Sequence, residues 1–270
     1  MNYRNITKQI KLVVTDIDNT LLRSDKSVSS YTKSVIEQCR AKDILIAFAT
    51  ARSENSCDSL IKILKPDAII SNCGAAVRYK DKVIHHVAIE KETTNSLLRE
   101  LLKIPEVKHI NVDSEKGYLI DQPVNEDSSW MIEYYPAYHV DFSQSIDCDS
   151  YKIAIMISDE TIAYELASCF SEIEAFPFSG EGWICYTSKN ADKYKGIEAL
   201  ASHINIFNHD ILAFGDDFHD VEMLKRCGIG VAVSNAVDEA KAAADFICDD
   251  CNEDGVAKWL EKYVIGSGSF

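Results

Sequence analysis

The sequence has no uninterrupted apolar run of about 18 residues, the length that a membrane-spanning helix requires. Its first residues, MNYRNITKQIK, also lack the apolar stretch of a secretory signal peptide. We therefore expect a globular, cytoplasmic protein. The chain has 270 residues, 46% of them hydrophobic, which is enough for one large domain or two smaller ones with buried cores.

Positive charge is scarce. The chain has 28 lysines and arginines against 43 aspartates and glutamates, which gives a net charge of −15 at pH 7. This balance argues against nucleic acids and anionic membranes as partners, because both are bound through a basic surface. A small anionic substrate is compatible with it if a metal ion, a lysine or helix N-termini supply local positive charge. The composition indicates no oligomeric state.

The cysteines do not form the pattern of a disulfide framework. The nine of them are scattered and odd in number, and most lie inside predicted helices or strands. Cys248 and Cys251 form a single C-x-x-C motif, without the second pair that a zinc site of this kind requires. We interpret the cysteines as small buried side chains, and the role of this pair stays open.

The order of predicted elements indicates an α/β fold with a doubly wound parallel sheet. Strands are expected at 10–15, 44–50 and 67–71, helices at 29–41 and 53–64, and the same alternation resumes at residue 210. Between these parts the sequence predicts hairpin strands, the first at 77–86, and two helices. We expect a Rossmann-like core domain of residues 1–80 and 189–270, with an inserted α+β domain of residues 81–188.

Polar side chains follow the predicted strands, at the edge where ligands bind in an open α/β sheet. The residues that directly follow a strand or begin the helical stretch KYKGIEALASHI are Asp16, Asp18, Thr50, Lys193, Asp216, Asp217 and Asp220. Because strand side chains alternate, we expect Asp16 and Asp18 to point to one side, where their charges repel unless a cation separates them. Carboxylates, a hydroxyl and an ammonium group together suit Mg²⁺ and a phosphoryl group.

This set of side chains is compatible with phosphoryl transfer in two steps. An ionised aspartate can attack phosphorus, and a partner carboxyl with a raised pKa can protonate the leaving alcohol. Each feature alone has a simpler interpretation, since an acidic pair after a strand or a threonine before a helix is often only a helix cap. Their order and their common placement at strand ends favour a functional site.

Four segments resemble, in order, the four motifs of the haloacid dehalogenase superfamily. They are DIDNT at 16–20, ATAR at 49–52, the lysine at 193 and GDDFHD at 215–220. Three longer stretches, TSKNADKYKGIEALASHINI, GDDFHDVEMLKRCGIGVAVSNA and NEDGVAKWLEKY, are similar to the Cof-type, sugar-phosphatase-like branch. The resemblance covers nearly the whole chain. It implies a magnesium-dependent phosphatase in which an α/β cap is inserted between Thr50 and Lys193.

The resemblance also implies a role for each matching residue. Asp16 is implied as the nucleophile and Asp18 as the general acid/base, with the backbone carbonyl of Asp18 on the metal. Thr50 and Lys193 are implied to hold the phosphoryl group, and Asp216 to complete the Mg²⁺ site. The supporting residues around them are Asp217, His219 and Asp220.

The sequence departs from the family pattern at four positions. The family commonly has glycine where Asn19 and Ala51 stand, and asparagine where Cys73 and His219 stand. The last two replace amide side chains near the expected site, and a histidine that titrates near pH 6.5 adds pH sensitivity there. Substrate contacts and turnover depend on these replacements.

Three alternatives stay open. A phosphomutase would transfer the phosphoryl group to a second hydroxyl, so that no free phosphate appears. A non-catalytic phosphate-binding or signalling protein would share the fold without turnover. Lys195 is the alternative phosphate-binding lysine, although it fits the family helix only with an insertion. The identity of the small phosphorylated substrate depends on the cap and is not indicated by these motifs.

Overall fold

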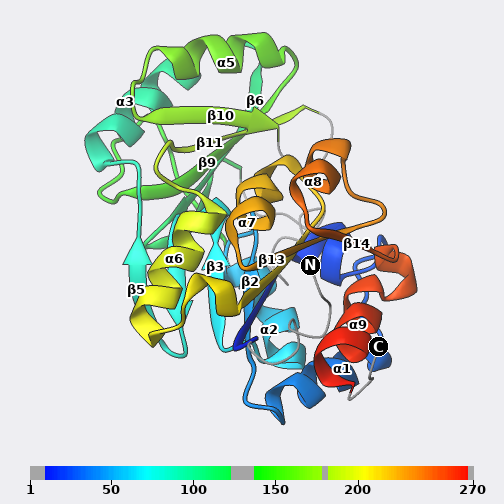
Figure 1. Ribbon diagram of the computed structural model, residues 1–270. Coiled ribbons are helices and arrows are strands. Elements are labelled where there is room, and N and C mark those ends of the chain that lie inside the picture. Colours follow the sequence, from blue (N-terminus) through cyan, green and yellow to red (C-terminus); the bar gives the residue numbers. More distant parts are fainter. Residues whose placement is uncertain (1–9, 123–136, 178–181, 267–270) are drawn as a thin grey trace. The chain divides into compact units, whose positions relative to one another are not determined.

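The computed structural model describes residues 10–122, 137–177 and 182–266, and the chain divides into two compact units (Figure 1). The first unit comprises the chain up to Ala51, Leu60–His85 and the chain from Asp192 on, and the second comprises Arg52–Ser59 and His86–Ala191. Strand β5 (Lys82–His86), expected in the inserted domain that begins at residue 81, joins the sheet of the first unit. Arg52–Ser59, expected in the core domain, belong to the second unit.

The first unit is built on an eight-stranded sheet with the order β14-β13-β12-β1-β2-β3-β4-β5. Its parallel strands are β1 (Leu12–Thr15), β2 (Leu45–Ala49), β3 (Ala68–Ser71), β12 (Ile211–Gly215), β13 (Ile229–Val233) and β14 (Phe246–Cys248). Strand β4 (Ala76–Tyr79) runs antiparallel to β3. The structure thus confirms the predicted doubly wound sheet, with β1 between β2 and β12.

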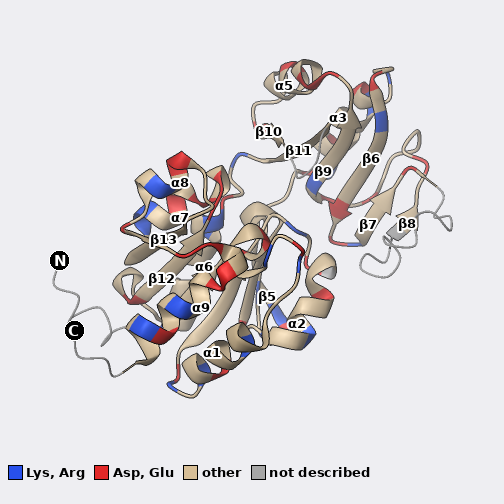
Figure 2. Ribbon diagram, turned by 90° about the vertical axis from the view of Figure 1, so that its right-hand side faces the viewer, with Lys and Arg blue, Asp and Glu red and all other residues tan. Residues whose placement is uncertain are grey.

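Helices cover both faces of this sheet, which is why its central strands are apolar throughout. The helices of this unit are α1 (Ser30–Arg40), α2 (Asp58–Leu64, which begins in the second unit), α6 (Lys193–Ile204), α7 (Val221–Arg226), α8 (Asp238–Ala243) and α9 (Gly255–Leu260). Side chains of α6 and α7 pack with Leu12 and Val14, whereas Trp259 of α9 contacts Phe214. The strands β1, β2, β3, β12 and β13 contain no charged residue, whereas Figure 2 shows charged residues on many of the helices and loops.

The second unit is an α+β structure, as expected for the inserted segment. Its six-stranded sheet has the order β10-β11-β9-β6-β7-β8. The elements are α3 (Lys91–Leu101), β6 (Val107–Ser114), β7 (Gly117–Ile120), β8 (Ala137–His139), β9 (Ser150–Ile157), α5 (Glu160–Ser168), β10 (Ile173–Pro177) and β11 (Trp183–Ser188). One apolar core joins both helices to the sheet, with Leu98 and Ala163 packed against residues such as Ile155.

None of the nine cysteines, all of which lie within the described residues, forms a disulfide bond, and all but Cys169 are buried, which agrees with their interpretation as small buried side chains. Burial raises the pKa of Cys248 to about 12 and that of Cys251 to about 11, so both thiols keep their protons at neutral pH. Within the described ranges, no helix combines the length and the apolar composition needed to cross a bilayer.

Candidate active site

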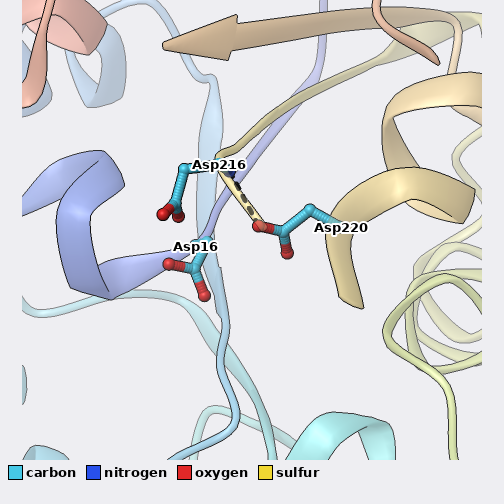
Figure 3. Close-up of side chains that lie close together, drawn as sticks. All are labelled: Asp16, Asp216 and Asp220. Atoms are coloured by element: carbon cyan, nitrogen blue, oxygen red, sulfur yellow. Dashed lines mark hydrogen bonds between the residues drawn. The ribbon is translucent and has the colours of Figure 1, made fainter. Parts of the chain in front are cut away.

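The acidic residues of the predicted site converge at the carboxyl ends of two neighbouring strands. Strand β1 ends directly before Asp16 and β12 directly before Asp216, and the two strands are paired in parallel. Carboxylate oxygens of Asp16, Asp216 and Asp220 lie within 4.8 Å of one another (Figure 3). Residues 200 positions apart in the sequence therefore form one acidic cluster, which we define as Asp16, Asp216 and Asp220.

A tight turn places Asp220 in this cluster. Its Oδ2 accepts hydrogen bonds from the backbone N–H groups of Asp216, at 2.8 Å, and Asp217, at 3.1 Å. Gly215 permits this approach, since a Cβ atom there would lie 2.5 Å from the Cβ of Asp220. Asp217 stays outside the cluster and caps the turn by accepting the N–H of Phe218 at 2.7 Å.

Lys193 supplies the positive charge of the cluster from the first turn of α6. Its Nζ lies 2.6 Å from Oδ1 of Asp16 and 2.6 Å from Oδ1 of Asp220, and its side chain is 3% exposed. Burial by itself lowers the pKa of Lys193, but the two carboxylates outweigh burial and raise it above its usual range. The side chain of Asp192 caps α6 by accepting the N–H of Lys195 at 3.0 Å.

The carboxyl groups are in excess over the single ammonium group. Burial raises the pKa of Asp16 well above its usual value, although Lys193 opposes the effect. Burial, together with the charge of Asp220, raises the pKa of Asp216 to about 7. Three carboxyl groups around one lysine leave unbalanced negative charge, and a hard divalent cation is the partner that carboxylate oxygens at this spacing suit. The donor set therefore fits Mg²⁺.

Asp18 does not join the acidic cluster. Strand β1 ends at Thr15, so Asp16 and Asp18 lie in the loop that follows the strand and not in the strand itself. The chain turns instead through Asn19, which has left-handed backbone angles (φ 54, ψ 9). The Asp18 side chain is 32% exposed, and its Oδ1 accepts a hydrogen bond from Lys26 at 2.8 Å.

Thr20 is a site residue that the sequence reasoning missed. It is buried, and its hydroxyl donates to Oδ1 of Asp216 at 2.6 Å, which links the loop after β1 to the loop after β12. The available signal in the sequence is its position as the last residue of the motif DIDNT, next to the two aspartates.

Thr50 and His219 lie next to the elements that hold the cluster. Thr50 is buried directly after β2, its N–H donating to the carbonyl of Ile70 at 2.8 Å and its carbonyl accepting from the N–H of Cys73 at 3.0 Å. Cys73 is buried and adopts a left-handed backbone conformation (φ 58). Burial, reinforced by the charge of Lys193, lowers the pKa of His219, so the imidazole is neutral at pH 7.

Comparison with known proteins places this arrangement in a family. The haloacid dehalogenase-like hydrolases match residues 13–260. The chain is 26% identical over 277 residues to the stress response protein YhaX of Bacillus subtilis (strain 168), covering 94% of this chain and 93% of that protein. It is 26% identical to a phosphoglycolate phosphatase of Methanopyrus kandleri, covering 94% of this chain and 97% of the relative.

Solved structures show the same fold. A haloacid dehalogenase-like hydrolase from Bacteroides thetaiotaomicron superposes with a TM-score of 0.82 at 22% identity, covering 94% of this chain and 99% of that one. A sugar phosphatase of haloacid dehalogenase subclass IIB gives a TM-score of 0.79 at 25% identity, covering 93% of this chain and 98% of that one. The chain therefore belongs to the haloacid dehalogenase-like hydrolases and is an enzyme of the phosphatase type within that family.

Proposed function

We propose that the protein is a magnesium-dependent phosphomonoester hydrolase that acts on a small phosphorylated metabolite through an aspartyl-phosphate intermediate. The observation that carries this proposal is the buried contact of Asp16 with Lys193 beside two further carboxyl groups. Relatives named as phosphatases of phosphoglycolate and of 5-amino-6-(5-phospho-D-ribitylamino)uracil, and a sugar phosphatase among the solved structures, support a small phosphorylated substrate.

Asp16 and Asp216, together with the backbone carbonyl of Asp18, would hold the Mg²⁺ ion. When bound, the ion neutralises charge on the cluster and on the phosphoryl oxygens. Thr50 and Lys193 would orient the phosphoryl group, the first through its hydroxyl and the second through its ammonium group. Asp220 supports Lys193 by accepting from its Nζ at 2.6 Å.

The carboxylate of Asp16 would attack phosphorus while the bond from phosphorus to the leaving oxygen breaks. Asp18 would give its proton to that oxygen, which releases the alcohol. In the second step the Asp18 carboxylate would take a proton from the attacking water, inorganic phosphate would leave, and Asp16 would be regenerated. Contact with Lys193 favours the ionised form of Asp16 that the first step needs.

We assign the second unit as the cap that selects the substrate, in agreement with its insertion between Thr50 and Lys193. A phosphomutase is the second candidate, because the first chemical step and the cluster would be the same. The two differ in the acceptor of the phosphoryl group, which is water in the hydrolase and a substrate hydroxyl in the mutase. Release of inorganic phosphate decides between them.

The test is the hydrolysis of para-nitrophenyl phosphate by the purified protein, with Mg²⁺ and with a chelator. Asp16→Asn keeps the shape of the side chain but removes the nucleophile, so we expect turnover to fall by at least about 10⁴-fold. Asp25→Asn is the matched control. It makes the same chemical change at an exposed position in the following loop, and it should leave the rate within about twofold.

Loss of release in the chelator and in Asp16→Asn, with full activity in Asp25→Asn, supports the hydrolase. Wild-type rates in a folded Asp16→Asn protein would remove the nucleophile assignment. If no phosphate is released, transfer from a doubly hydroxylated phosphomonoester is followed by ³¹P NMR, which detects the mutase.

A further inference from the structure

A single turn after β13 holds both loops that carry the acidic cluster. The side-chain N–H of Asn235 donates to the backbone carbonyl of Asn19 at 2.7 Å, and the backbone N–H of Val237 donates to the carbonyl of Asp216 at 2.8 Å. The Thr20 hydroxyl joins the two loops directly through Asp216. The turn, the loop after β1 and the loop after β12 therefore form a closed ring of hydrogen bonds.

Asn235 contacts the loop after β1 at Asn19, the residue of that loop with an unfavourable backbone conformation. Asn19 has a left-handed backbone (φ 54, ψ 9), which is unfavourable for a residue with a side chain and tolerated best by asparagine and aspartate. The peptide that follows Asn19 connects it to Thr20, and the peptide that precedes it belongs to Asp18. The Asn19 carbonyl is part of the peptide between Asn19 and Thr20. A hydrogen bond to this carbonyl therefore restricts the rotation of that peptide.

A second hydrogen bond orients the Asn235 amide. Its Oδ1 accepts the backbone N–H of Cys251 at 2.9 Å, so its NH₂ group must face Asn19. The Cys251 segment is itself held to the first loop, because Asp254 accepts from Arg23 at 2.8 Å and Asn252 accepts from the N–H of Ser24 at 3.1 Å. A flipped amide would place a carbonyl oxygen against a carbonyl and an NH₂ group against an N–H.

We propose that Asn235 is a positioning residue for phosphoryl transfer. It acts through the Asn19 carbonyl on Asp18 and Thr20, and thereby on the acid/base group and on Asp216. This inference rests on the proposed function. Asn235 is exposed, so its hydrogen bonds contribute little to global stability. Displacement of a reacting group by about 1 Å, by contrast, costs about 100-fold in rate.

The test compares Asn235→Asp with Asn235→Ala. The aspartate still accepts the Cys251 N–H but cannot donate to Asn19, so it removes one hydrogen bond selectively, whereas alanine removes both. We expect kcat for para-nitrophenyl phosphate with Mg²⁺ to fall about 10- to 100-fold in both, with KM within about threefold. Asn252→Ala is the matched control, because it removes hydrogen bonds to Ser24, farther along the first loop, without touching residues 16–20, and it should keep wild-type kcat.

Backbone hydrogen exchange of a peptide covering residues 16–22, followed by mass spectrometry, gives a readout that does not require activity. Exchange should be faster in Asn235→Asp than in wild type and unchanged in Asn252→Ala. Unchanged exchange, a kcat within about twofold of wild type, or global unfolding of both Asn235 variants would overturn the proposal. If the wild type hydrolyses no phosphomonoester, the proposed function fails, and hydrogen exchange alone then decides whether Asn235 positions the loop.

Discussion

At the residue scale, Lys193 is the group on which the other charges of the site depend. A buried charge is costly unless it is paired, and Lys193 pairs with two carboxylates at once. It compensates only part of the negative charge, which is why burial still leaves the pKa values of Asp16 and Asp216 raised. The remaining negative charge of the site therefore favours the binding of a further cation.

Lys193→Ala should reduce kcat/KM for para-nitrophenyl phosphate by about 100-fold or more, mainly through weaker phosphate binding. It should also destabilise the metal-free protein by about 3 kcal/mol, because two buried carboxyl groups lose their partner. Steady-state kinetics with inhibition by inorganic phosphate measures the loss of phosphate binding, and urea unfolding measures the loss of stability. Lys195→Ala is the control on the same helical turn, where the side chain is exposed. A larger loss of phosphate binding in Lys195→Ala would transfer the role to that lysine.

The sequence was sufficient to find residues whose placement follows from strand order. Asp16, Asp216 and Lys193 directly follow a strand or begin a helix, so the parallel sheet brings them together. Asp18 and Thr20 depend on the left-handed turn at Asn19, which no periodic pattern encodes. The contacts of these two residues were therefore not predicted.

At the element scale, close packing of α6 sets the position of Lys193. A Cβ atom at Gly196 would lie 2.6 Å from Cγ2 of Ile70 on β3, so the helix lies directly on the sheet. Gly74 has a positive φ of 98°, and a Cβ atom there would lie 2.1 Å from the Asp192 carbonyl oxygen. Both glycines therefore lie at close contacts that fix the start of α6.

Gly196→Ala should destabilise the protein by about 1–3 kcal/mol, because the added methyl group must push α6 away from Ile70. Alanine favours a helix by about 1 kcal/mol relative to glycine. A net loss of stability would therefore mean that the packing cost exceeds this gain. The same displacement should lower kcat/KM, since it moves Lys193. Ser202→Ala, at an exposed position of α6, is the control and should not destabilise. A stabilised Gly196→Ala protein with full activity would show that the contact relaxes freely.

Element boundaries were predicted where local signals mark them. The helix expected at 29–41 is observed as α1 at Ser30–Arg40, with Ser29 as its N-cap. The helix expected at 53–64 begins only at Asp58, after a short 3₁₀ turn at Asn55–Cys57. The hairpin at 77–86 extends the core sheet as β4 and β5. Hairpin patterning indicates strands but not the sheet that they join, which depends on long-range pairing.

At the scale of the whole molecule, the acidic cluster makes stability depend on pH. In the metal-free protein Asp216 has a pKa of about 7, against 3.8 for an ordinary aspartate. Between about pH 4 and 7 the folded state keeps a proton that the unfolded state has released, so stability falls as the pH rises. This carboxyl alone should lower the free energy of unfolding by about 2–3 kcal/mol between pH 5 and 8. The lowered pKa of His219 acts in the opposite direction below about pH 6.5.

Asp216→Asn separates the effect of Asp216 on stability from that of His219. The amide keeps an oxygen that can accept a hydrogen bond from Thr20 but does not titrate. The wild type in chelator should lose about 5 °C or more in thermal midpoint relative to Asp216→Asn between pH 5 and 8. Mg²⁺ should restore the wild type more at pH 8 than at pH 5, since the ion and the proton compete for the same carboxylates. Equal slopes in the two proteins would contradict the prediction, because they would show that Asp216 does not change its protonation state between pH 5 and 8 in the metal-free protein.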